Sequence, residues 1–131
     1  MPHHFHSVIY LDHSEATIYE FSATDATERR IRPADHEGNI HHKAGTVGSG
    51  HEHNDKNYFK AIAEAVQPTH EVLIVGHGTE KAEFAHFVRD HVPSLAPRIQ
   101  GVETVDQPTK NEIVAFARKF FEQRDRMTPQ R

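Results

Sequence analysis

One short apolar run restricts the folds open to this chain of 131 residues. Residues 71–75 read EVLIV, without the polar alternation of a strand that exposes one face. Such a run is typical of a central parallel strand, which is buried on both faces of its sheet. It is followed by Gly76-His77-Gly78-Thr79, which predicts a tight turn with Thr79 as the cap of the next helix. The chain is therefore expected to contain a βα unit, with helices covering its sheet.

The remaining strand patterns extend this expected sheet. Residues 7–12 and 15–21 are rich in β-branched and aromatic residues, and the two residues between them predict a tight antiparallel hairpin. Residues 27–32 indicate a third, more charged strand, and residues 98–105 a last one. Three antiparallel strands followed by crossover units give a mixed five-stranded sheet.

Three helices are predicted from apolar residues at helical spacing and from capping residues. The first begins at Asn54 or Asp55, the second follows Thr79, and the third follows Thr109, where Glu112 completes a capping box. The expected order is β-β-β-α-β-α-β-α, a single α/β domain over residues 1–131. Its core covers about residues 7–123, its long polar loop residues 33–53 and its tail residues 125–131.

Composition limits the functional classes. The formal net charge of −4 does not mark a nucleic-acid binder, although a local basic patch remains open. There is no cysteine, so disulfides and thiolate zinc sites are excluded. No apolar run approaches the ~20 residues of a membrane span, and the start MPHHFH lacks the pattern of a signal peptide. A soluble cytoplasmic protein is expected.

The polar segment 33–53 is the candidate functional loop, because compact domains rarely keep such a loop without a function. It is rich in glycine and histidine, and 13 histidines make this residue the compositional outlier. Glycine N–H groups and basic side chains suit a phosphate backbone, and basic residues of the third strand are expected to extend the same positive face. The candidate RNA-binding residues are Arg29, Arg30, Arg32, His41, His42, Lys43, Gly48, Ser49, Gly50, His51, His53 and Lys56.

An ordered series of segments links the chain to one translation family. The segments are VIYLD at 8–12, EATI at 15–18, NYFKAIAE at 57–64 and VLIVGHG at 72–78, followed by Lys81, Phe84 and Phe87. In this series the sequence resembles the central domain of archaeal and eukaryotic peptide-chain release factors and of their relative Pelota. The resemblance covers roughly residues 7–123. It implies a ribonuclease-H-like fold, and the chain looks most like the stand-alone bacterial relatives described as translational-machinery proteins.

The resemblance breaks at one functional motif. In release factors the loop before the long helix carries Gly-Gly-Gln, which enters the peptidyl transferase centre. The equivalent stretch here is Gly48-Ser49-Gly50-His51, without glutamine, and Pelota also lacks the triplet. The resemblance therefore implies a non-catalytic, translation-associated protein that contacts the ribosome or tRNA through this loop. No cofactor and no hydrolysis of peptidyl-tRNA are expected.

Two other functions stay open. A metal-dependent hydrolase or nuclease would use loop histidines, such as His51 and His53, or the carboxylates of Asp12 and Asp106. Asp12 and Asp106 also suit turns, where aspartate accepts backbone hydrogen bonds. The third option is a homodimeric scaffold in which an exposed edge of the sheet pairs with a second copy.

Overall fold

The computed structural model describes residues 6–12, 14–22, 24–33, 47–106 and 108–127, with only the helical backbone for residues 47–55 and 125–127. Within these residues the chain forms five strands, three α-helices and one short 3₁₀ helix. The strands are β1 (His6–Leu11), β2 (Ala16–Phe21), β3 (Ala26–Ile31), β4 (Glu71–Gly76) and β5 (Ile99–Thr104). The helices are α2 (Val47–Ala65), α3 (Glu80–His91), η2 (Ala96–Arg98) and α4 (Lys110–Met127).

The five strands form one mixed sheet in the order β3-β2-β1-β4-β5. β1 pairs antiparallel with β2, and β2 antiparallel with β3. On its other side β1 pairs in parallel with β4, which pairs in parallel with β5. The expected α/β architecture with a mixed five-stranded sheet is confirmed, and the ends of the strands differ from the predicted ones by about one residue.

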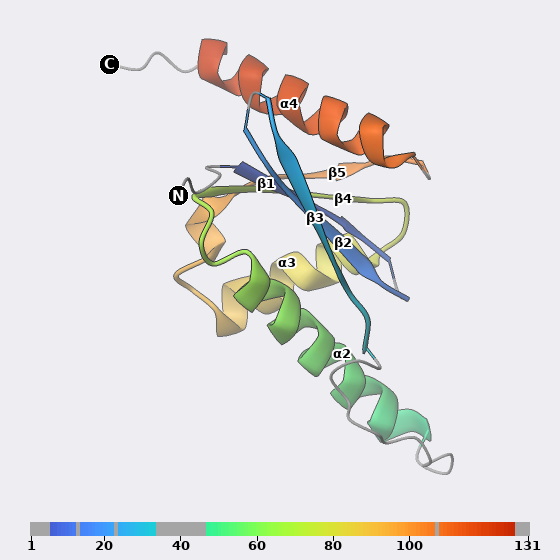
Figure 1. Cartoon of the computed structure of the whole chain (residues 1–131). Coiled ribbons are helices and arrows are strands. Elements are labelled where there is room, and N and C mark those ends of the chain that lie inside the picture. Colours follow the sequence, from blue (N-terminus) through green and yellow to red (C-terminus); the bar gives the residue numbers. More distant parts are fainter. Residues whose placement is uncertain (1–5, 13, 23, 34–46, 107, 128–131) are drawn as a thin grey trace.

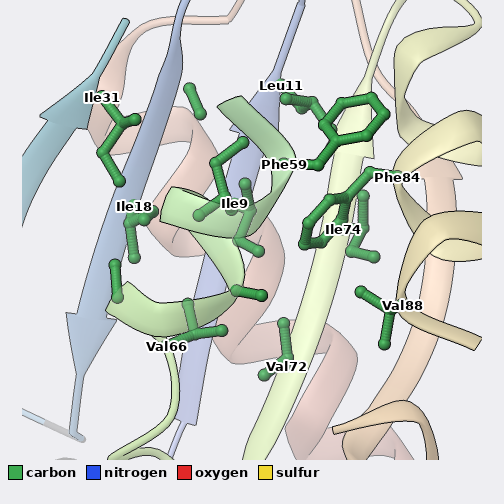
Figure 2. Close-up of a cluster of buried hydrophobic side chains, with 14 of the residues drawn as sticks. Ile9, Leu11, Ile18, Ile31, Phe59, Val66, Val72, Ile74, Phe84 and Val88 are labelled. Atoms are coloured by element: carbon green, nitrogen blue, oxygen red, sulfur yellow. The ribbon is translucent and has the colours of Figure 1, made fainter. Parts of the chain in front are cut away.

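Helices cover both faces of the sheet, with α2 and α3 on one face and α4 on the other (Figure 1). Successive strand residues point to opposite faces, so β1 contributes to two separate cores. Ile9 and Leu11 lie under α2 and α3, together with Phe59 and Phe84 (Figure 2). On the α4 face the buried residues are Val8, Tyr19, Phe21, Leu73, Val75, Ile113, Val114, Ala117 and Phe121.

The turn after β4 follows the sequence prediction. A side chain at Gly76 would place its Cβ 2.5 Å from the backbone oxygen of Leu11, so the close approach of β4 to β1 requires glycine. Thr79 occupies the N-cap position of α3, but its side chain makes no capping hydrogen bond. At the start of α4 the capping box is confirmed: the N–H of Thr109 donates to Glu112 Oε1 at 2.9 Å, and the N–H of Glu112 donates to Thr109 Oγ1 at 3.2 Å.

The predicted start of the first helix is wrong. α2 begins at Val47, so Asn54 and Asp55 lie inside the helix and do not cap it. Residues 47–53, which the sequence assigned to the loop, are helical. Each glycine costs the helix only about 1 kcal/mol relative to alanine, while every added residue gains one backbone hydrogen bond. A helix anchored by its buried C-terminal half therefore extends through this stretch, which contains no proline.

Candidate nucleic-acid interface

Of the three arginines predicted to form a basic patch, Arg29 and Arg30 lie on opposite faces of β3, and Arg32 follows the end of this strand. Arg29 is aligned with Ile18, whose side chain packs under α2 and α3. Arg30 is aligned with Thr17 and therefore points to the α4 face. Because successive side chains of a strand point to opposite faces of the sheet, these arginines do not form the single positive face that was predicted.

Carboxylates neutralise part of this charge. Arg30 Nε lies 3.1 Å from Glu28 Oε2, and Glu28 Oε1 lies 3.2 Å from Lys110 Nζ at the start of α4. Arg32 Nε lies 3.1 Å from Glu15 Oε1. Arg29 is exposed and forms no ion pair within the described part of the chain. Of the three arginines, Arg29 is therefore the one without an ion-pair partner among the described residues.

Lys56 lies at a groove between α2 and α3. Both Lys56 and Lys60 are exposed and stand one helical turn apart on its rim. The groove has a volume of about 420 Å³, and the tilted rings of Phe87 and His91 contact each other along its α3 side with centroids 4.8 Å apart. α3 packs over β4 and β5, whereas β3 forms the opposite edge of the sheet. The two lysines and Arg29 therefore flank α2 on opposite sides.

The N-terminal half of α2 projects beyond the sheet (Figure 1). Burial along this helix is seen from Tyr58, with Lys56 and Asn57 exposed just before it. The predicted site residues Gly48, Ser49, Gly50, His51 and His53 belong to this projecting backbone, and their side chains are outside the described atoms. The predicted residues His41, His42 and Lys43 lie outside the described residues.

A second polar group gathers where the parallel strands β1 and β4 end. The hydroxyl of Tyr10 and Nδ1 of His77 are 3.0 Å apart. Burial raises the pKa of Tyr10, and the negative charges of Asp12 and Asp106 raise it further. The sequence placed Asp12, His77 and Asp106 near strand ends but missed Tyr10, whose role depends on the parallel pairing of two strands distant in sequence.

Asp12 stabilises the turn between β1 and β2. Its Oδ1 accepts hydrogen bonds from the N–H groups of Ser14 at 2.8 Å and Glu15 at 3.0 Å, which fixes the β1–β2 turn. Among the described residues, no three histidine or carboxylate side chains lie close enough together to hold a metal ion. Nor does the described part of the chain contain a helix long and apolar enough to cross a membrane.

Comparison with known proteins shows what the fold is similar to. No protein-family model and no curated protein matches the sequence. Among solved structures, Pelota from Archaeoglobus fulgidus matches 87% of this chain with a TM-score of 0.56 and 13% identity. Dom34 of S. cerevisiae, described as a translation termination-like factor, matches 91% with a TM-score of 0.50 and 10% identity. The chain spans 30% of that Pelota chain and 36% of that Dom34 chain, so the likeness establishes a Pelota-like domain fold.

Proposed function

We propose that this chain is a translation-associated RNA-binding protein that contacts ribosomal RNA or tRNA without catalysing a reaction. The contact is made by the N-terminal half of α2 and the segment before it. The projection of α2 beyond the sheet carries this proposal, because it presents a helix end that the core does not cover (Figure 1). The Pelota-like fold supports a role in translation, as a stand-alone bacterial relative of that domain acting in the cytoplasm.

The charges on the described part of α2 support binding to phosphate. The first turn contains no acidic residue, and the positive end of the helix dipole attracts anions. Lys56 and Lys60 add two exposed cations to this helix, followed one turn later by the exposed Glu64. Arg29 on the neighbouring strand adds a further exposed cation. Phosphate contacts of this kind give affinity without sequence specificity.

The residues at the projecting end support binding without hydrolysis. Residues 48–51 read Gly-Ser-Gly-His and have helical backbone. The stretch contains no glutamine, which the release-factor motif requires. We therefore propose that the protein retains the position of that motif and not its reaction.

Co-sedimentation with ribosomes tests the proposal. One variant combines Lys43→Ala, His51→Ala and His53→Ala, and a second combines Lys56→Glu and Lys60→Glu. Both are expected to reduce the pelleted fraction, and added salt is expected to reduce it for the parent protein, since phosphate contacts release counterions. Lys119→Glu, an exposed position on α4 across the sheet, is the matched control and is expected to pellet like the parent.

Two results would contradict the proposal. One is a parent protein that stays in the supernatant when ribosomes pellet. The other is equal pelleting of the parent and both variants, which would place the contact elsewhere. A Lys119→Glu variant that loses binding as strongly as the double variant would show that net charge alone governs the association.

A further inference from the structure

The two edges of the sheet have different surfaces. β3 carries Glu28, Arg29 and Arg30 along its middle, and charge of this kind discourages pairing with another strand. β5 contains one charged residue, Glu103, and its Val102 is 39% exposed. Among the described strands none pairs with the outer side of β5. A weakly charged edge with an exposed valine is a site for strand addition.

Side-chain directions on β5 define which partner register fits. Gly101 faces α4, because a Cβ there would lie 2.8 Å from the ring of Phe120. Glu103 is aligned with Val75, which is buried on the α4 face, and Val102 is aligned with Ile74, which is buried on the other face. In an antiparallel pair, residues directly opposite one another point to the same face.

We propose that β5 pairs antiparallel with β5 of a second copy of this chain, across a two-fold axis at Val102. The two copies of Val102 then lie opposite each other on the face of α2 and α3. Gly101 lies opposite Glu103 of the second copy, and both point to the α4 face. The same contacts occur twice, as an isologous interface requires.

Charge complementarity selects a second copy as the occupant of this edge. Within the described residues Glu103 forms no ion pair. The exposed Arg124 donates to Gln100 Oε1 at 2.7 Å, and its guanidinium carbon lies 5.9 Å from the centre of the Phe120 ring. The ring of Phe120 lies over Gly101, and Arg124 lies beside this ring. In the dimer, Glu103 of the second copy lies opposite Gly101 and therefore next to Arg124, and Gly101 has no side chain that would separate them.

The size of the contact makes the dimer weak and reversible. β5 has six residues. Its pairing with β4 is irregular: Val72 pairs with Ile99 and Leu73 with Gly101, which leaves Gln100 as an extra residue in β5. The regular stretch that the register uses begins at Gly101. A strand pair of this length lies at the low end of interface sizes. The population of dimer therefore depends on protein concentration.

Disulfide trapping tests the register, because the chain has no cysteine of its own. The single substitution Val102→Cys places two thiols beside the two-fold axis. Because the N–H of Val105 donates to Gly76 of β4, the backbone of Val102 faces the outer edge. The two Cα atoms then lie about 5.5 Å apart, as in a hydrogen-bonded antiparallel pair, which is within the range that a disulfide spans. Phe116→Cys is the matched control, because Phe116 is 38% exposed and lies on α4. Under mild oxidation the Val102→Cys protein is expected to form covalent dimers, and the Phe116→Cys protein to form none. Equal cross-linking of both, or of neither, overturns the proposal.

Charge exchange tests the pairing of Glu103 with Arg124. Analytical ultracentrifugation over a range of concentrations is expected to show dimerisation weakened about tenfold by Glu103→Arg or by Arg124→Glu, since two exposed pairs become repulsive. The variant with both substitutions is expected to dimerise like the parent. Circular dichroism confirms that each variant is folded. A parent protein that stays monomeric throughout, or a double variant as weak as the single ones, contradicts the proposed interface.

Discussion

The hydroxyl of Tyr58 in α2 donates a hydrogen bond of 2.9 Å to the backbone carbonyl of Asp12. The side chain of the same aspartate accepts two N–H groups of the β1–β2 turn. Asp12 therefore closes the β1–β2 turn through its side-chain carboxylate and binds α2 through its backbone carbonyl. This connection fixes the point at which α2 leaves the core and begins to project, since Tyr58 is only 1% exposed.

Removing this hydroxyl is expected to weaken the attachment of α2. Tyr58→Phe keeps the buried ring and should lower the free energy of unfolding by about 1 kcal/mol, because the bond to the Asp12 carbonyl is lost. Tyr58→Leu also removes the ring that packs against Phe59, so it should cost more. Urea denaturation followed by circular dichroism measures both. Equal stability of the parent and the Phe variant would show that the bond contributes nothing.

Gly76, the last residue of β4, and Gly78 in the turn after it should differ sharply in their tolerance of a methyl group. Gly76→Ala is expected to lower the free energy of unfolding by about 1–3 kcal/mol, because the Cβ would meet the rigid backbone of Leu11. At Gly78 the new Cβ would meet only Oε1 of Glu80, the mobile end of a side chain, so Gly78→Ala should be near neutral. Thermal unfolding of both variants provides the comparison. A larger loss for Gly78→Ala would contradict the assigned close approach of β4 to β1.

The environment of Tyr10 predicts a dependence of stability on alkaline pH. Its folded-state pKa is raised by burial and then by Asp12 and Asp106, above the value of about 10 expected in the unfolded chain. The unfolded chain therefore loses its phenol proton first. The contribution to stability is complete below about pH 10 and is lost as the pH rises through the folded-state pKa.

Substitution separates this effect from other titrations. Tyr10→Phe is expected to make the fall in stability above about pH 10 less steep. Asp106→Asn should lower the pKa of Tyr10 toward its ordinary value, as followed by ultraviolet titration. Tyr19 also has a raised pKa, through burial first and then Glu28, so Tyr19→Phe identifies its share of the signal. An unchanged titration curve in the Asp106→Asn variant would show that this carboxylate does not act on Tyr10.

The fold could be predicted from local sequence patterns because each local preference agreed with the position of the segment in the folded structure. The apolar run of residues 71–75 is buried between two parallel neighbours, as its lack of alternation indicated. Thr109 and Glu112 form the expected reciprocal capping bonds. Both features depend on residues that are close together in the sequence, and they can therefore be recognised without knowledge of the tertiary structure.

The candidate site was harder to predict because its geometry depends on pairing between distant segments. Tyr10 meets His77 only because β1 and β4 run in parallel with a defined register. The helical state of residues 47–53 opposes the preference of their glycines, so local propensity pointed to a loop. The separation of Arg29 from Arg30 is different, because the period-two alternation of a strand already places adjacent residues on opposite faces.

The central place of β1 has a consequence for how the chain reaches its folded state. β1 pairs with the adjacent β2 on one side, and on the other side with β4, whose Glu71 lies 65 residues after His6. Local hairpins form faster than pairings that close a long loop. During synthesis the β1–β2–β3 meander can therefore form before β4 is available. Until then the other edge of β1 is unpaired and its apolar side chains are exposed. We expect this interval, before residue 76 has emerged, to be when the nascent chain is most prone to aggregate.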